Sequence, residues 1–460
     1  MRGSGFCNSS SANFTLAPKS PFYRCIHGVQ KKICYSDKKE VFEKRESAAD
    51  VIDLLVLFTF QYKSWMSTDR TKKRYREGVA VFLRFKTTSA EYVASRARDP
   101  TFDKLMKNYK NYLKVVSVQD LLLADTTNNS SISVHFLSKL SQKLHLNHGA
   151  SSFLRKYPHI FNIFYNHSKS EPFYKLTDKA LQISREEAAA IEASKPIVIE
   201  RLVRILSMSV SKSLPLRAVF KVWRELGLPD GFEESIISQN PKLFSLSDAP
   251  NEPNTHIIKL ESINPNFITA VENWREDECN KKDSKVDESQ IRFAFKQGYP
   301  PGMKLGKVFR GKVKEWQTLS YVGPYDQMGE KGKPKAGVKA LEKRAVGIVH
   351  EFLSLTVEKM IEVEKISHFR KWFGIDLNIR DLFLDHPGIF YLSTKGKTHT
   401  VFLREAFERG CLIEPNPVYI ARRKLLDLVI MSRRGLFLTQ SDTRNIRARE
   451  EVELTEDDDD

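Results

Sequence analysis

The sequence lacks long hydrophobic runs and the common short catalytic motifs. Its most apolar stretch, residues 51–60, is interrupted by Asp53 and is far shorter than the roughly 18 residues that a transmembrane helix needs. The chain contains no GxxxxGK[ST] phosphate loop, no HExxH and no GxSxG elbow. We therefore predict a non-enzymatic protein that does not enter a membrane, with no catalytic residues and no cofactor.

Cysteine is also scarce. The five cysteines are odd in number, far apart and without CxxC spacing, which indicates reduced thiols rather than a disulfide framework or a metal cage. His145 and His148 could share a helical face, but no third ligand lies nearby in the sequence. We predict no metal site, and a surface or capping role for the two histidines.

Acidic residues are absent from the first 36 positions, which contain five Lys or Arg and many Ser and Asn. No apolar segment follows these charges, so the composition is typical of an organelle transit peptide rather than a secretory signal. A disordered arm has the same composition and stays an alternative. Residues 37–95 form a poorly defined basic N-terminal region.

Positive charge dominates the rest of the chain. The net charge is +17, and the last eleven residues carry eight acidic side chains and no basic one. Without these eight negative charges, residues 1–449 carry +25. Such an excess favours a polyanionic partner, although a merely soluble basic protein is the simpler alternative. Residues 434–460 are predicted to be a disordered acidic tail.

A phrase of fixed spacing occurs three times: two apolar residues, three variable ones, Pro, any residue, Ile or Leu, Phe, any residue and an aliphatic. The three prolines are Pro158, Pro241 and Pro387. Proline disfavours helical angles in the preceding residue, so a helix is expected to end there, and the alternating apolar residues that follow suit a strand. A second apolar segment follows each copy. The repeat predicts a helix, a strand, a loop and a strand, used three times.

The fold class predicted from this repeat is mostly α with small β-hairpins (α+β), built from tandem winged-helix-like helix–helix–hairpin units. Residues 96–274 hold the first and second units, and residues 347–433 hold the third unit with a basic helix at 417–432. Residues 275–346 form a charged connector and a basic segment rich in Gly and aromatics, which excludes one long uninterrupted helix. Apolar spacing predicts further helical structure at 133–146 and 345–366.

The basic segment provides the main candidate binding residues, because cations neutralise phosphates and aromatic faces stack on unpaired bases. Its glycines would let a sugar–phosphate backbone approach closely. The aromatic residues taken singly are more often core anchors than binding residues. The candidates in this segment are Lys304, Lys307, Arg310, Lys312, Lys314 and Trp316.

Two smaller cationic groups complete the candidate site. Arg217, Lys221 and Arg224 are spaced at i, i+4 and i+7, so they share one side of a helix. Lys395 and Lys397 are expected at the tip of the third hairpin, where a wing would touch a nucleic-acid backbone. Taken alone, each group is most often an ordinary solvated surface. The overall positive charge favours a binding role for the two groups together.

Several longer stretches resemble a known family. They include Ala-Arg-Asp-Pro-Thr-Phe-Asp at 97–103, Phe-Leu-Arg-Lys-Tyr-Pro-His-Ile-Phe at 153–161, Tyr-Val-Gly-Pro-Tyr at 321–325, and the segments 299–317 and 386–397. Together they resemble the plant organelle RNA recognition (PORR) family. The resemblance implies RNA binding in a mitochondrion or a chloroplast, with members that promote group II intron splicing. The first two stretches resemble mitochondrial members more closely. No residue-level RNA contact follows from the resemblance.

The first functional hypothesis is therefore an organellar RNA-binding splicing factor whose partners are intron RNA and other splicing factors. A winged-helix DNA-binding or transcription-associated organelle protein is the second hypothesis, because winged units commonly read duplex DNA. The third hypothesis is a scaffold that recruits splicing proteins through its acidic tail and basic body.

Overall fold

The computed structural model describes residues 98–124, 131–249, 255–262, 267–280, 288–300, 302–326, 337–396 and 398–432. The predictions for 1–36, 37–95 and 434–460 lie outside these ranges. The chain divides into two compact units, one of residues 86–228 with 240–460 and one of residues 1–85 with 229–239. All elements below belong to the first of these units, except η1.

One order of elements occurs three times: helix, short strand, helix, helix, strand, strand. In the first copy it comprises α4 (Pro100–Ala124), β1 (Ser131–Ser133), α5 (Val134–Leu140), α6 (Ala150–Lys156), β2 (Phe161–Asn166) and β3 (Glu171–Leu176). In the second it comprises α8 (Lys195–Met208), β4 (Ser213–Pro215), α9 (Leu216–Leu226), the π-helical turn η1 (Glu233–Ile237), β5 (Phe244–Asp248) and β6 (His256–Leu260). In the third it comprises α13 (Val338–Leu355), β7 (Met360–Glu362), α14 (Val363–Ser367), α15 (Ile379–Asp385), β8 (Phe390–Ser393) and β9 (Thr400–Leu403).

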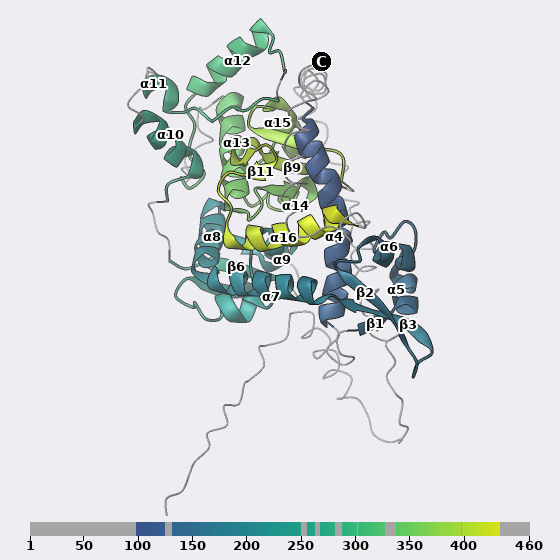
Figure 1. Cartoon of the computed structure of the whole chain (residues 1–460). Coiled ribbons are helices and arrows are strands. Elements are labelled where there is room, and N and C mark those ends of the chain that lie inside the picture. The colour runs from purple at the N-terminus through teal and green to yellow at the C-terminus, as the bar shows by residue number, and fades with distance from the viewer. Residues whose placement is uncertain are drawn as a thin grey trace, which may run out of the picture. The chain divides into compact units, whose positions relative to one another are not determined.

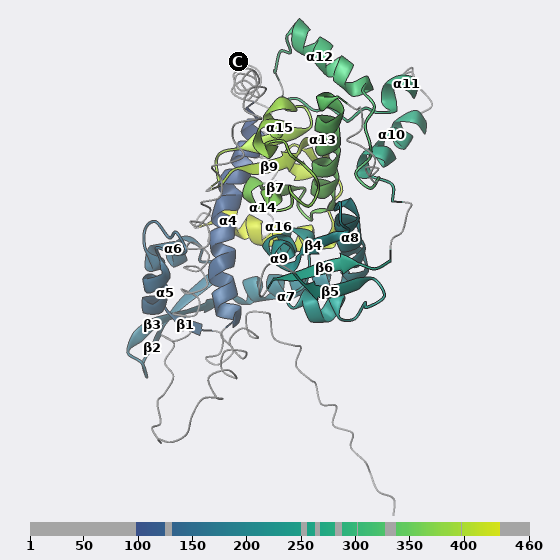
Figure 2. The same cartoon turned by 180° about the vertical axis from the view of Figure 1, so that it is seen from behind.

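The remaining elements connect or follow these copies. They are α7 (Asp178–Ala193), α10 (Ala270–Asn280), α11 (Glu288–Ile291), α12 (Lys307–Thr318), η2 (Arg404–Ala406), β10 (Phe407–Glu408), β11 (Cys411–Leu412) and α16 (Pro417–Met431). Figures 1 and 2 label most of them. The predicted class, a mostly helical chain with small antiparallel sheets, is confirmed. The winged-helix assignment stays a prediction.

The three three-stranded sheets of the described residues share one strand order, and β10 and β11 form a separate two-stranded sheet. In each of the three, the hairpin's second strand lies in the middle and pairs antiparallel with both the first hairpin strand and a three-residue edge strand, as in the order β1-β3-β2. The sequence predicted the hairpins but not the edge strands β1, β4 and β7. The prediction of helical structure over 345–366 is wrong at β7, and the helix predicted over 133–146 ends at Leu140.

The repeated proline phrase forms the same turn each time. The carbonyl of the residue before Pro accepts hydrogen bonds from the amides two and three positions after Pro, and the Phe at the third position begins the strand. The accepting residues are Tyr157, Asn240 and His386, with an N–O distance of 3.0 Å to each amide partner. The helix therefore ends where the proline predicts, and the strand begins within the phrase.

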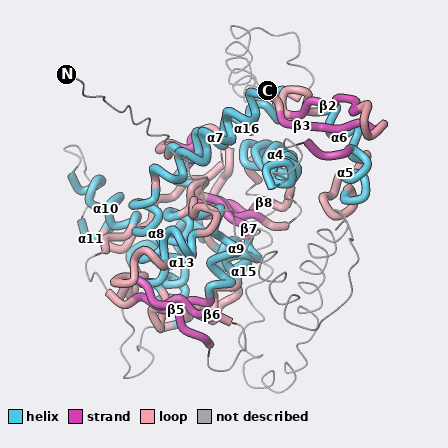
Figure 3. Tube along the Cα trace, turned by 90° about the horizontal axis from the view of Figure 1, so that it is seen from below, coloured by secondary structure: helices cyan, strands magenta, loops and turns pink. Residues whose placement is uncertain are grey.

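Helix α4 links the first and third copies. Along its length, Tyr112, Val115 and Leu122 pack in a core with the first hairpin and with Leu425 of α16. Near its start, Phe102 and Met106 pack with β7, β8 and β9 in a second core. Figure 2 shows α4 passing both the first and third sheets, and Figure 3 shows α16 beside α4 and α7. Across the described ranges, no helix has both the length and the apolarity that crossing a bilayer requires.

Candidate nucleic-acid interface

Helix α12 holds most of the predicted binding residues. The segment is a 12-residue helix that begins after Gly306 and has no buried residue. It contains Gly311, where an added Cβ would meet nothing within 4 Å. The sequence correctly excluded a long helix here but missed this short one. Figures 1 and 2 show α12 at the outer edge of the described elements, beyond α13.

The cations of α12 divide between two sides of the helix. At 100° per residue, Lys307, Arg310 and Lys314 share one face, whereas Lys312 points to the opposite side. These four side chains and Lys304, which precedes the helix, are exposed. No described carboxylate forms an ion pair with any of the five. The α12 surface, which we define as these five cations, is therefore unneutralised within the described chain.

Trp316 has a packing role that the other candidates lack. Its ring is half-buried, with centroids 5.5 Å from Phe295 and 4.5 Å from His386. The ammonium of Lys343 lies 4.6 Å from the same ring. These contacts attach α12 to the third copy. Direct RNA stacking by Trp316 stays a prediction, and the observed contacts agree with the expectation that single aromatics of this segment are core anchors.

Lys343 also holds the end of α12. Its buried Nζ donates hydrogen bonds to the carbonyls of Trp316, Gln317 and Leu319, at 2.7, 2.9 and 2.7 Å. The final carbonyls of a helix have no partner within the helix, and a cation there also opposes the negative end of the helix dipole. A side chain from α13 thus fixes the C-terminal end of the basic helix.

Burial of Lys343 makes stability depend on pH. Burial, with a smaller contribution from the Arg275 charge, lowers the pKa of Lys343 to about 7, against an ordinary 10.5. The unfolded chain then binds the proton more tightly, so stability should rise as pH increases from about 7 towards 10.5. The slope from one such group is at most about 1.4 kcal/mol per pH unit. We expect Lys343→Met to reduce this rise in urea unfolding between pH 7 and 9.

The matched control for this prediction is Lys339→Met, which removes an exposed lysine of the same helix and should leave the slope unchanged. Lys359, whose pKa burial and the Arg201 charge lower to about 8, adds to the rise in both variants. Equal slopes in wild type and Lys343→Met would contradict the prediction.

On α9 the predicted cationic stripe is partly neutralised. Arg217 is exposed, and the Lys221 ammonium lies 2.6 Å from Nε2 of His368. Arg224 donates two hydrogen bonds to the carboxylate of Asp120 on α4, at 3.0 and 3.1 Å. Bidentate pairs of this kind hold their geometry well. Arg224 therefore joins α9 to α4, and its charge is shared with Asp120.

The third hairpin places Lys395 in the loop between β8 and β9, as expected, while Lys397 lies outside the described residues. Lys395 is half-buried. An added Cβ at Gly396 would come within 2.9 Å of the Met106 side chain of α4. The tip of this hairpin thus lies against α4.

A second unneutralised surface, which the sequence analysis did not single out as a site, runs along α4. Its exposed or half-buried lysines are Lys104, Lys107, Lys110 and Lys114. Burial, then the charges of Lys110 and Lys156, lowers the pKa of Lys114, so these three cations lie close enough to repel. None of the four α4 lysines forms an ion pair with a described carboxylate. Their spacing of three or four residues was the signal that could have identified them.

The plant organelle RNA recognition domain matches residues 97–434, from just before α4 to just after α16. This chain belongs to that family. The resemblance noted in the sequence is therefore confirmed. No solved structure matches the chain significantly.

Several plant proteins are similar to about three quarters of this chain. The protein ROOT PRIMORDIUM DEFECTIVE 1 of Arabidopsis thaliana is 40% identical over 347 residues, which are 74% of this chain and 84% of that protein. The protein WHAT'S THIS FACTOR 9, mitochondrial, from the same plant is 29% identical over 76% of this chain and 90% of its own length. The protein WHAT'S THIS FACTOR 1 homolog, chloroplastic, also from Arabidopsis thaliana, is 27% identical over 74% of this chain and 63% of its own length.

Not every cation of this PORR chain is available to a ligand. Arg344, Arg404 and Arg422 are buried along with Lys343. Arg404 of η2, which follows the third copy, pairs with Asp99, the residue preceding α4, at 2.9 Å. The net charge thus overstates the cationic surface, and the exposed lysines of α4 and α12 are its clearest described parts.

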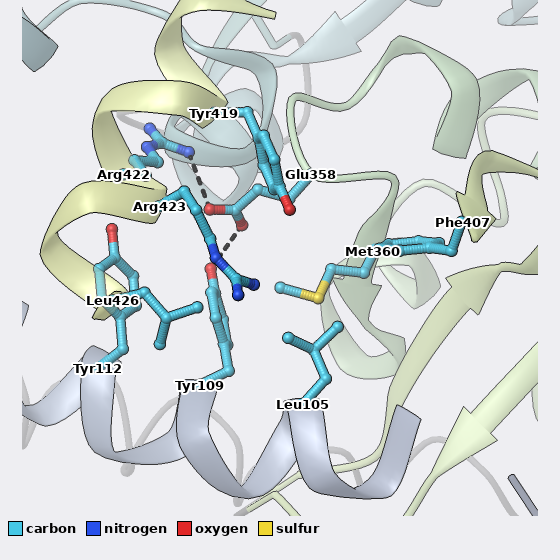
Figure 4. Close-up of a pocket in the computed structure, with 10 residues that line it drawn as sticks. All are labelled: Leu105, Tyr109, Tyr112, Glu358, Met360, Phe407, Tyr419, Arg422, Arg423 and Leu426. Carbon is cyan, nitrogen blue, oxygen red and sulfur yellow. Dashed lines mark hydrogen bonds and ion pairs between the residues drawn. The ribbon is translucent and has the colours of Figure 1, made fainter. Parts of the chain in front are cut away.

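Figure 4 shows a cavity between α4 and α16, lined by polar and apolar side chains. Glu358 accepts a hydrogen bond from Tyr109 at 2.5 Å and lies 3.6 Å from Arg422. The cavity measures about 20 Å³, enough for one water molecule and far too small for a nucleotide. Throughout the described ranges, no three His, Cys, Asp or Glu side chains gather as metal ligands. The surface therefore offers the better candidate for ligand binding.

Proposed function

We propose that this protein binds RNA in a plant organelle through the cationic surfaces of α12 and α4. The observation that carries the proposal is the set of exposed lysines and arginines on these helices without carboxylate partners in the described chain. Like charges held close together repel and destabilise the fold. The negative charges of a polyphosphate partner relieve this repulsion, and the release of its counterions adds to the free energy of binding. Membership of the PORR family supports RNA as that partner.

Within that function, the proposed role is promotion of group II intron splicing without catalysis by the protein itself. The family resemblance supports this role, and helices that carry cations on separate faces suit a protein that holds a folded RNA at more than one place. Other splicing factors are proposed as additional partners. The proposed compartment is the mitochondrion, which one relative's name gives, with the chloroplast as the alternative that another relative's name gives.

The test is a binding measurement on the full chain with intron RNA, a single-stranded RNA of the same length and a duplex DNA. We expect RNA to bind more tightly than duplex DNA, and affinity to fall steeply between 50 and 200 mM salt, by at least about tenfold. A preference for duplex DNA would favour the transcription-associated alternative. RNA affinity that ignores salt would refute the cationic surfaces as the binding site.

A further inference from the structure

The hairpin of the first copy extends beyond its sheet. Its strands β2 and β3 have six residues each, and β1 pairs only with residues Phe173 to Lys175 of β3. From the Tyr165–Pro172 pair to the turn, the hairpin is a two-stranded ribbon, and no third strand from the described residues pairs with it. The residues of this ribbon, 165–172, are exposed or half-buried.

An aromatic side chain stands on this ribbon. Alternation along β2 places Tyr165 on the same face as Phe161 and Ile163, and the register sets it opposite Pro172. Phe161 is buried, whereas Tyr165 is 54% exposed. The apolar face of the hairpin thus continues past the core that it covers. The ring of Tyr165 meets that of His167 edge to face, with centroids 5.3 Å apart.

Cations accompany the aromatic rings of this hairpin. The ammonium of Lys169 lies 5.2 Å from the Phe173 ring, and that of Lys175 lies 6.0 Å from the Phe164 ring. The hairpin has one acidic residue, Glu171, whose carboxylate accepts a hydrogen bond from the Ser133 hydroxyl at 2.7 Å. The hairpin is therefore mainly positive. Alternation places Lys175, with Phe164 and Phe173, on the face opposite Tyr165, whereas Lys169 belongs to the exposed turn that joins the two strands.

We propose that the first hairpin is a contact site for single-stranded RNA, in which an unpaired base stacks on Tyr165 while the sugar–phosphate backbone passes round the turn, where Lys169 and, on the opposite face, Lys175 neutralise phosphates. The inference rests on the proposed function and adds a site to it. An exposed aromatic ring next to a cationic turn matches the two chemical features of a single strand, a flat base and a charged backbone. The third hairpin has no such exposed tyrosine among its described residues. Its Tyr391 is buried, and the Tyr391 hydroxyl donates a hydrogen bond to the Asp103 carboxylate.

The test compares Tyr165→Ala with Tyr165→Phe in the full chain. The probes are an unstructured single-stranded RNA and the blunt duplex that it forms with its complement. We expect Tyr165→Ala to weaken single-strand binding by about tenfold, Tyr165→Phe to bind like wild type, and duplex binding to stay unchanged. The dependence of affinity on salt should be the same in all three proteins, because stacking releases no counterions.

Leu246→Ala is the matched control, since Leu246 is an exposed apolar strand residue of the second hairpin, 45% exposed, without an aromatic face. It should leave RNA binding unchanged. If wild type binds and Tyr165→Ala binds equally well, the hairpin site is wrong and the proposed function stands. If Tyr165→Ala weakens binding of the single strand and of the duplex by the same factor, the stacking role is also wrong. Wild type that binds neither probe refutes the proposed function itself.

Discussion

Replacing Arg422 by methionine is expected to destabilise the fold by about 3–5 kcal/mol, the usual cost of breaking a buried ion pair. The Arg422 guanidinium is 5% exposed. It lies 2.8 Å from the Glu187 carboxylate on α7 and 3.6 Å from that of Glu358, and it donates to the Arg224 carbonyl on α9 at 3.0 Å. One side chain of α16 thus joins α7, α9 of the second copy and the segment between α13 and β7 of the third copy.

The expected loss comes from the carboxylates that remain. Burial raises the pKa of Glu358, and the Arg422 charge opposes that rise. Without the guanidinium, Glu358 and Glu187 must either stay charged in a poorly solvated site or take up protons, and both cost free energy. Tyr109, which donates to Glu358, cannot supply the missing positive charge.

Urea unfolding of the full chain measures the effect, with Arg423→Met as the control. Arg423 is the next residue of α16 and pairs with Asp427 at 3.1 Å on a more exposed face, so its loss should cost no more than about 1 kcal/mol. If Arg422→Met fails to fold, the triple variant Arg422→Met, Glu358→Gln, Glu187→Gln should restore folding, because it leaves no buried charge unpaired. A loss below about 1 kcal/mol for Arg422→Met would contradict the prediction.

The ion pairs of Arg422 with Glu187 and Glu358 could not be predicted from the sequence. Residues 417–432 were correctly predicted to be a helix, but the prediction described it only as basic and did not identify Arg422 as a buried residue. Its partner Glu187 is 235 residues earlier in the chain, and no local pattern connects the two. Periodicity identifies a helix and its apolar stripe, whereas the partner of a charge depends on how distant helices pack.

The sequence predicted the three hairpins but not the edge strands that pair with them. Each hairpin was predictable because Pro ends a helix and the following apolar residues alternate over several positions. The edge strands β1, β4 and β7 have three residues each, too few to show a period, and they form because a central strand offers them hydrogen bonds. Exposure of Lys307 and its neighbours agrees with the sequence-based expectation of a cationic surface, and their role in binding remains the proposal.

The α12 surface gives the second large effect. We expect the triple variant Lys307→Glu, Arg310→Glu, Lys314→Glu to weaken RNA binding by about 100-fold at 100 mM salt, because three contacts become repulsive. The slope of log affinity against log salt should fall by about 2, since each lost phosphate contact with a single strand removes about 0.7. Electrophoretic or fluorescence titration across a salt series measures both quantities.

The control reverses three exposed cations outside α4 and α12, namely Lys242, Lys371 and Arg380, so that the change in net charge is the same. A general effect of net charge would weaken binding equally in both triple variants, and the α12 surface would then have no special role. Lys312→Glu separates the two sides of the helix, because its side chain points away from the shared face. If RNA lies along the Lys307–Arg310–Lys314 face, this single reversal should cost less than reversal of Arg310 alone, whereas the opposite ranking would place RNA on the other side of α12.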